Sequence, residues 1–182
     1  MKHRLLDPPT CSHHMPNILG LDISPTKVGV AFSSPTDGCA IPLATLVRRS
    51  SKKNKKQHND EFVSQQLKAI VSDYEVSQFI IGWPLELSGA RSISCENVLL
   101  FTHFLHLEGL ITNDSPGCLW DERMSTSLAY SIAVEAMVPG RTSKDSRPPR
   151  AGAEYRAAEK FRKSGGEDSM AATIILQGFC DH

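Results

Sequence analysis

Short apolar runs separated by polar stretches predict a series of strands. In Asn17 to Phe32, two apolar runs flank a Ser-Pro-Thr turn, which is typical of a strand that turns tightly and returns. Ala40 to Val47 predicts a third strand, in which Pro42 favours a sheet edge or a strand start. Phe79 to Gly82 predicts a brief buried strand, and Cys118 to Trp120 predicts another short one.

Four segments predict helices, chiefly because apolar residues recur at helical spacing. They are Glu61–Tyr74, Ser94–Leu110, Ser125–Met137 and Asp168–Phe179. The apolar positions are Phe62, Leu67, Ile70 and Val71 in the first, Val98, Leu99, Phe101, Leu105 and Leu107 in the second, and Met170, Ala171, Ile174, Ile175 and Phe179 in the last. Strands that lead and helices that follow indicate an α/β domain with a mixed sheet.

The composition fits one globular domain. The 182 residues are 40% hydrophobic and 22% charged, and this length leaves room for one ordinary domain. We expect a flexible arm over residues 1–16, which lacks the apolar core of a secretory signal, and a domain over 17–182. Mobile loops are expected at about 48–59 and 139–152. No apolar run approaches the roughly 20 residues that span a membrane.

Cysteine usage favours a reducing compartment. The five cysteines are scattered, are odd in number and form no Cys-x-x-Cys pair, so neither a disulfide framework nor a structural zinc site is expected. We therefore expect a cytoplasmic protein. The first 16 residues contain a single acid, Asp7, which leaves chloroplast or mitochondrial targeting open if the source is a eukaryote.

Acidic residues within or beside apolar runs are the candidate chemistry. Asp22 lies between two apolar residues of the first predicted strand, where a charge is unfavourable without a partner. Asp121 and Glu122 follow the last predicted strand, and Asp168 begins the last helix. Carboxylates that converge at strand ends would need a hard cation, Mg²⁺ or Mn²⁺, which can activate water for phosphodiester cleavage. Alternatively, Asp168 is a helix N-cap, and one of Asp121 and Glu122 pairs with Arg123.

Four segments, in order along the chain, also carry a resemblance to a known family. They are Ile18–Ala31 (ILGLDISPTKVGVA), Ile80–Gly89 (IIGWPLELSG), Trp120–Thr126 (WDERMST) and Asp168–Phe179 (DSMAATIILQGF). They are similar to the first hairpin, the Gly-Leu-Pro segment, the Asp-Glu-Arg motif and the C-terminal helix of the YqgF/RuvX family of pre-16S rRNA nucleases and Holliday-junction-resolvase-like proteins. The resemblance implies a single-domain RNase H-like fold, with a mixed central sheet flanked by helices.

The resemblance also implies the site. The catalytic and metal-binding residues, for Mg²⁺ or Mn²⁺, would be three carboxylates: Asp22, Glu122 and Asp168. Lys27 lies where the family commonly has a basic residue near the site, and Arg123 would orient the strand end or contact phosphate. Gly82 and Pro84 would shape a loop beside the site, where a side chain at Gly82 would obstruct a nucleic-acid backbone.

The chain departs from the family pattern at several positions. Ser24, followed by Pro25, replaces the usual glycine, and Trp83 replaces the usual leucine. An exposed Trp83 would stack on a base, whereas a half-buried one would pack in the protein. Two basic tracts, one of them from Arg141 to Lys163, are either phosphate contacts or solvated loops without a partner. The candidate contacts in the other tract are Arg48, Arg49, Lys52, Lys53, Lys55 and Lys56.

These features together predict a metal-dependent endonuclease acting on structured nucleic acid. The resemblance implies ribosomal RNA precursor as the substrate, with a Holliday-junction-type DNA resolvase as the alternative. Resolvases of this fold act as dimers, and the sequence leaves monomer and homodimer open. A binding factor for ribosome assembly or transcription, without catalysis, is a further alternative, although three gathered carboxylates argue against it. An ATP-handling fold of the sugar-kinase type needs two domains and does not fit the length.

Overall fold

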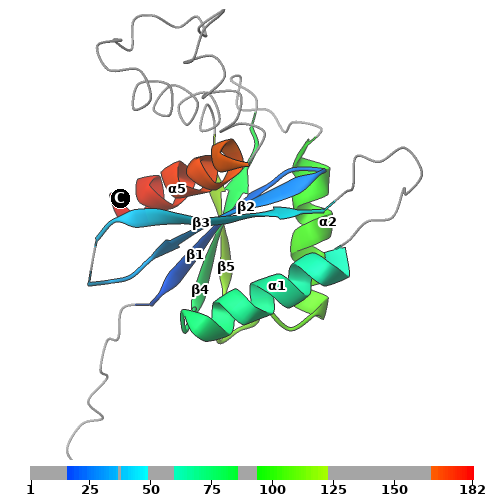
Figure 1. Ribbon diagram of the computed structural model, residues 1–182, viewed down its shortest axis with the longest axis horizontal. Helices are drawn as coiled ribbons and strands as arrows, with labels where there is room; N and C mark the ends of the chain where they lie inside the picture. Colours follow the sequence, from blue (N-terminus) through cyan, green and yellow to red (C-terminus); the bar gives the residue numbers. More distant parts are fainter. Residues whose placement is uncertain (1–15, 37, 49–59, 86–93, 123–164) are drawn as a thin grey trace, which may run out of the picture.

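The computed structural model describes five stretches of the chain: residues 16–36, 38–48, 60–85, 94–122 and 165–182. They form one mixed β-sheet with helices on both faces (Figure 1). The predicted helix Ser125–Met137 and the predicted loop 139–152 lie outside the described residues, as do residues 1–15. Within the described part of the chain, no helix combines the length and the apolar character needed to cross a membrane.

Five strands build the sheet, and each contains one of the predicted apolar runs. They are β1 (Ile18–Ile23), β2 (Lys27–Ser33), β3 (Ala40–Val47), β4 (Gln78–Trp83) and β5 (Gly117–Asp121). Their order is β3-β2-β1-β4-β5. The β1–β2 and β2–β3 pairs are antiparallel, whereas β4 is parallel to both β1 and β5. The predicted α/β class with a mixed central sheet is therefore confirmed, and β3, which contains Pro42, lies at an edge.

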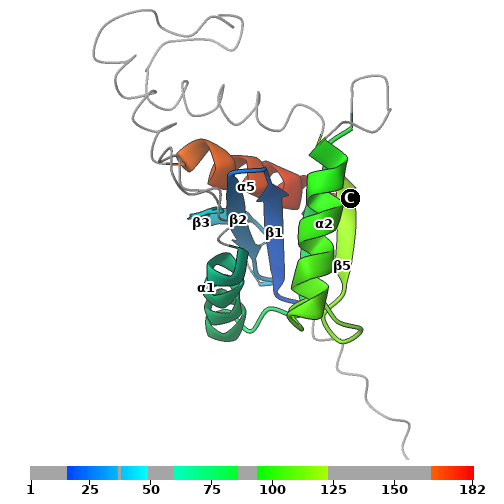
Figure 2. The same ribbon diagram turned by 90° about the vertical axis from the view of Figure 1, so that its right-hand side faces the viewer.

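Different helices cover the two faces of the sheet (Figures 1 and 2). The helices are α1 (Asp60–Asp73), α2 (Ser94–Leu107) and α5 (Gly166–Cys180). Helices α1 and α2 enclose the larger core, which contains Leu21 and Phe101, and α5 encloses the smaller core, which contains Ile80 and Leu176. Because side chains alternate along a strand, β1 presents Leu21 to the larger core and the adjacent Asp22 to the α5 face.

Only some of the apolar positions named from the sequence lie on the inward faces of the helices. Phe62 in α1 is 52% exposed, and Leu99 and Leu107 in α2 are exposed as well. The buried positions are Val63, Ser64 and Leu67 in α1 and Ala171, Ala172, Ile175 and Leu176 in α5. Helices α1 and α2 thus carry apolar residues on more than one side, and packing against the sheet selects the inward face.

Candidate active site

The candidate site lies at the end of the sheet where β1 finishes. Asp22 pairs with Gly29 of β2, and its neighbour Leu21 pairs with Ile81 of β4, which precedes Gly82. Asp22 is thus flanked by a glycine on both adjacent strands. Alternation along the strands places all three residues on the face that α5 covers. The missing side chains leave space there for groups from other elements.

Two of the predicted carboxylate residues fill the space above these glycines. A Cβ atom on Gly29 would collide with the backbone carbonyl oxygen of Asp168. A Cβ atom on Gly82 would collide with Oε2 of Glu122 and approach Cδ1 of Ile175 to 2.8 Å. Glycine therefore allows both residues to approach the sheet closely. For Gly82 this adds a reason that was not predicted, since a side chain there would strike Glu122; the expected obstruction of a nucleic-acid backbone stays a prediction.

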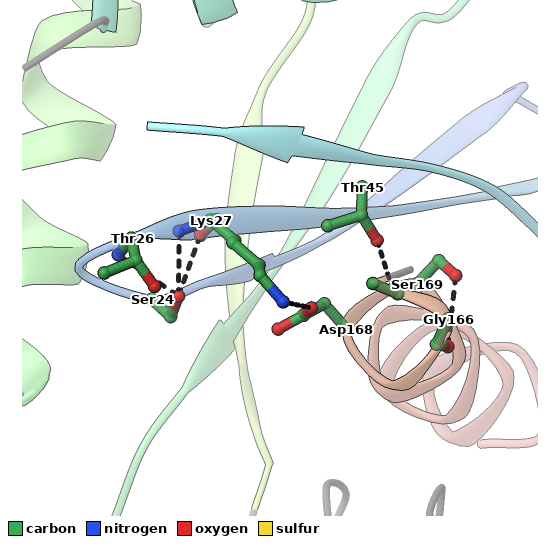
Figure 3. Close-up of polar contacts among 8 residues, drawn as sticks. Ser24, Thr26, Lys27, Thr45, Gly166, Asp168 and Ser169 are labelled. Carbon is green, nitrogen blue, oxygen red and sulfur yellow. Dashed lines mark hydrogen bonds and ion pairs between the residues drawn. The ribbon is translucent and has the colours of Figure 1, made fainter. Parts of the chain in front are cut away.

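Asp168 lies in the first turn of α5. The N-cap position is Gly165, which has φ 85° and supplies no side-chain cap, so the alternative that Asp168 caps the helix is wrong. The Thr45 hydroxyl donates a hydrogen bond to the Gly165 carbonyl and anchors this end of α5 to β3. The Asp168 carboxylate accepts from the Lys27 ammonium at 2.9 Å (Figure 3).

The turn between β1 and β2 holds Lys27 in place. The Ser24 hydroxyl accepts a hydrogen bond from the Lys27 backbone N–H and donates one to the Lys27 carbonyl, each at 3.0 Å (Figure 3). The Ser24 N–H also donates to the Lys27 carbonyl, at 2.9 Å. Ser24, the residue that departs from the family's glycine, therefore uses its side chain to close the turn. Lys27 lies beside the candidate site, where the resemblance implied a basic residue.

Burial and like charges raise the pKa of the Asp22 and Glu122 carboxyl groups. The pKa of Asp22 is raised from 3.8 to about 7, first by burial and then by the negative charges of Asp168 and Glu167. The pKa of Glu122 is raised from 4.5 to about 8, first by burial and then by Asp22 and Asp121. Among the described residues, no group hydrogen-bonds to the buried Oε2 atom of Glu122. The site therefore holds more carboxyl groups than Lys27 can neutralise.

These residues fit a hard divalent cation in their chemistry. Carboxylate oxygens are the ligands that Mg²⁺ and Mn²⁺ prefer, and a buried oxygen without a partner is a suitable donor. Within the described residues, however, no three His, Cys, Asp or Glu side chains are clustered as a ready-made ligand set. Asp22, Glu122 and Asp168 share one end of the sheet, and their role as metal ligands stays a prediction.

Trp83 lies away from this group. It is half-buried and packs against the larger core, on the face of the sheet opposite Asp22. The packing alternative is thus the one that the structure supports. Pro84 follows directly, and its carbonyl accepts a hydrogen bond from the Cys95 thiol at 3.2 Å.

Arg48 is not part of an exposed basic loop. Its exposed fraction is 4%, and its guanidinium forms a two-pronged ion pair with Asp60. The prediction that Arg48 contacts phosphate is therefore wrong, because its guanidinium is buried and pairs with Asp60, twelve residues later in the chain. The remaining predicted contacts lie outside the described residues: Arg49, Lys52, Lys53, Lys55, Lys56 and Arg123.

Glu167 is a further acidic residue near Asp22 that was not among the predicted site residues. Its charge contributes to the raised pKa of Asp22, although Asp168 contributes more. The available signal was a pair of acids opening a helix, Glu167 and Asp168. Acidic residues are common in the first turn of helices because they complement the helix dipole, so this signal does not separate the two roles.

Comparisons with known proteins connect these features to a family. The family described as "RuvX: Holliday junction resolvase" matches residues 16–151. Relatives named "Putative pre-16S rRNA nuclease" occur in Ehrlichia chaffeensis, with 36% identity over 69% of this chain and 72% of the relative, and in Ehrlichia canis, with 32% identity over 90% and 84%.

A solved structure of RuvC from T. thermophilus, in complex with a Holliday junction substrate, is similar over 91% of this chain and 95% of that one. Its TM-score is 0.48 and its identity to this chain is 11%. The family assignment follows from the sequence matches, which include β1 with Asp22, and β5 with Glu122 directly after it. The chain belongs to the YqgF/RuvX family of nucleases, whose RNase H-like fold agrees with the mixed five-stranded sheet and its flanking helices.

Proposed function

We propose that the chain is a divalent-metal-dependent endonuclease that hydrolyses phosphodiester bonds in structured nucleic acid. Its catalytic carboxylates are Asp22, Glu122 and Asp168. The observation that supports this most is the raised pKa of Asp22 and Glu122, which results from burial and from crowding by other carboxyl groups. Such crowding of carboxyl groups is unfavourable for folding. In enzymes it occurs chiefly at active sites, where the carboxyl groups bind a cation or transfer a proton.

Each residue has a distinct task in this proposal. Asp22 and Asp168 hold the cations, and Glu122 completes the ligand set or positions the attacking water. Bound Mg²⁺ or Mn²⁺ supplies charge neutralisation at the phosphodiester and lowers the pKa of water. Lys27 restrains the Asp168 carboxylate through their 2.9 Å ion pair, so this ligand is oriented before substrate arrives.

The names of the relatives support ribosomal RNA precursor of the pre-16S type as the substrate. The family description favours a second candidate, a four-way DNA junction. Both substrates present closely spaced phosphates and require the same hydrolysis, so the carboxylates do not discriminate between them. A binding factor without catalysis would gain nothing from buried, mutually repelling carboxyl groups.

The test is a cleavage assay with Mg²⁺ or Mn²⁺ on labelled rRNA precursor, single-stranded RNA and a four-way DNA junction. Wild type is compared with Asp22→Asn and with Asp114→Asn, a matched control in which an exposed aspartate at the other end of the sheet is changed. Asp22→Asn should lower the cleavage rate by more than the roughly 10–100-fold that is typical when a residue hydrogen-bonded to a metal ligand is changed. Asp114→Asn should cleave as wild type does.

RNA cleavage that is lost only in Asp22→Asn would support the rRNA nuclease. Cleavage of the junction alone would favour the resolvase. Tight binding to RNA or DNA without cleavage, in wild type and with either metal, would overturn the enzyme and leave a binding factor.

A further inference from the structure

Arg48 joins three elements behind the candidate site. It follows the last residue of β3, and its Nε and Nη2 atoms donate to the two carboxylate oxygens of Asp60, the first residue of α1, at 2.9 and 3.0 Å. Nη1 donates to the backbone carbonyl of Ser24 at 2.9 Å. The guanidinium also lies 4.2 Å from the ring centre of Phe101 in α2.

These contacts hold the β1–β2 turn at two points. Besides the side-chain bond to Ser24, the backbone N–H of Arg48 donates to the Thr26 carbonyl at 2.8 Å. Ser24 comes two residues after Asp22, and Thr26 comes directly before Lys27. The turn therefore fixes the end of β1, one residue after Asp22, and the start of β2 at Lys27.

We propose that Arg48 is a positioning residue for the candidate site: it holds the β1–β2 turn against α1 and α2, and thereby aligns Asp22 and Lys27 with Asp168. A guanidinium suits this task because its planar fork binds a carboxylate at two points while a further N–H reaches a carbonyl. The catalytic consequence rests on the proposed nuclease function, whereas the structural consequence for the turn does not.

Arg48 could also affect activity in a second way, through the basic tract that follows it, and the experiment must distinguish this from an effect through the turn. Arg48 and Asp60 flank the basic tract from Arg49 to Lys56, so their ion pair joins the residues on either side of it. If Arg48 acted through that tract, its loss would weaken binding of nucleic acid. If it acts through the turn, its loss lowers the turnover of bound substrate instead.

The main variant is the double change Arg48→Met and Asp60→Asn. It removes both charges together, which avoids the large cost of leaving one buried charge unpaired. The matched control is Lys68→Met with Glu108→Gln, which removes the 2.8 Å ion pair between α1 and the residue that follows α2, away from the turn. Arg48→Lys keeps the charge without the fork and should restore part of the wild-type behaviour.

The first readout is amide hydrogen exchange, which needs neither metal nor substrate. The Ser24 and Lys27 amides should exchange roughly tenfold or more faster in the Arg48 double variant than in wild type. The Phe79 amide, which donates to the Pro116 carbonyl at the other end of the sheet, should be unchanged and serves as an internal control. The Lys68 double variant should leave the turn amides as in wild type.

The second readout is cleavage under saturating and subsaturating RNA. For the Arg48 double variant we expect kcat to fall roughly 10–100-fold, with KM and RNA affinity near wild type. Unchanged turn exchange, or weakened RNA binding at an unchanged kcat, would overturn the proposal. If wild type cleaves no substrate, the nuclease assignment fails, and the exchange measurement still decides the role of Arg48 in the turn.

Discussion

At the scale of single residues, the position of Glu122 depends on the absence of a side chain at Gly82. The Gly82 backbone lies so close to the Glu122 carboxyl that a single methyl group would occupy the same space. Ile175 lies on the same side, so the glutamate has little room to move toward α5. A carboxyl held in this way is oriented by the fold before any ligand binds.

We predict that Gly82→Ala lowers the free energy of unfolding by about 1–3 kcal/mol, the range typical of overpacked interiors. Gly178→Ala is the matched control, because a Cβ atom there meets only Nε1 of Trp120 at 3.4 Å and alanine favours the helix. Urea denaturation of both variants checks this. Equal stability of Gly82→Ala and wild type would show that Glu122 is free to move aside.

Single residues also differ in how far sequence could predict them. Asp22 was identifiable because a charge between apolar strand residues is costly unless something uses it. Arg48 was not, since it opens a run of basic residues and looks the same as Arg49 beside it. Its burial depends on Asp60 and Phe101, which only the folded chain brings to it.

At the scale of elements, α5 packs closely against the sheet at two glycines, Gly20 of β1 and Gly29 of β2. A Cβ atom on Gly20 would lie 2.8 Å from Cβ of Leu176, and one on Gly29 would strike the Asp168 carbonyl. These close approaches bring the first turn of α5, with Asp168, to the position where Lys27 reaches it. The packing of this helix therefore sets the geometry of the candidate site.

Gly29→Ala should move the first turn of α5 away from β2 and separate Asp168 from Lys27. We expect unfolding to become easier by about 1–3 kcal/mol, because backbone and not a flexible side chain blocks the new methyl group. Cleavage should fall as well, since the carboxylate shifts with the helix. Urea denaturation and the RNA cleavage assay measure the two effects, and Gly178→Ala again serves as the control. Full activity in Gly29→Ala would contradict this role of α5.

Periodicity predicted the strands better than the helix faces. Strands β1, β2 and β4 are short apolar runs bounded by turn residues, a pattern that is typical of strands. Helix α2 begins with the predicted residue but ends at Leu107, before Gly109, which has φ 74°. Its inward face could not be predicted from the spacing, because leucines occur all around it.

At the scale of the whole molecule, the crowded carboxyl groups link folding to pH. The pKa values of Asp22 and Glu122 are about 7 and about 8 in the folded protein, compared with 3.8 and 4.5 ordinarily. The folded state thus binds more protons than the unfolded state between about pH 4 and pH 8. Because the folded state must release these extra protons as the pH rises, it loses stability relative to the unfolded state across this range. The loss is absent below about pH 4 and complete above about pH 8.

We therefore predict that, without metal, this contribution makes the wild type less stable at about pH 8.5 than at about pH 5.5, by a few kcal/mol. Asp22→Asn should show a smaller loss, because it removes one of the two titrating groups and a charge near the other. Mg²⁺ should restore more stability at the higher pH. Urea denaturation at both pH values checks this, and identical pH dependence of wild type and Asp22→Asn would contradict it.

The convergence of the site could not be predicted from periodicity. Asp22, Glu122 and Asp168 are spread over most of the chain, and only the strand order β3-β2-β1-β4-β5 brings Asp22 and Glu122 to the same end of the sheet. Their grouping came from the family resemblance, which the sequence comparisons support. The two glycines that make room for them were visible in the sequence, but the groups that fill that space were not.

The most direct test of the central claim is a calorimetric titration with Mn²⁺ at about pH 8.5, above the pKa values of Asp22 and Glu122. It compares wild type, Asp22→Asn and Asp114→Asn. Wild type and Asp114→Asn should bind Mn²⁺ with the same affinity, and Asp22→Asn should bind at least about tenfold more weakly. Equal binding by all three proteins, or none by wild type, would contradict a cation site built on Asp22.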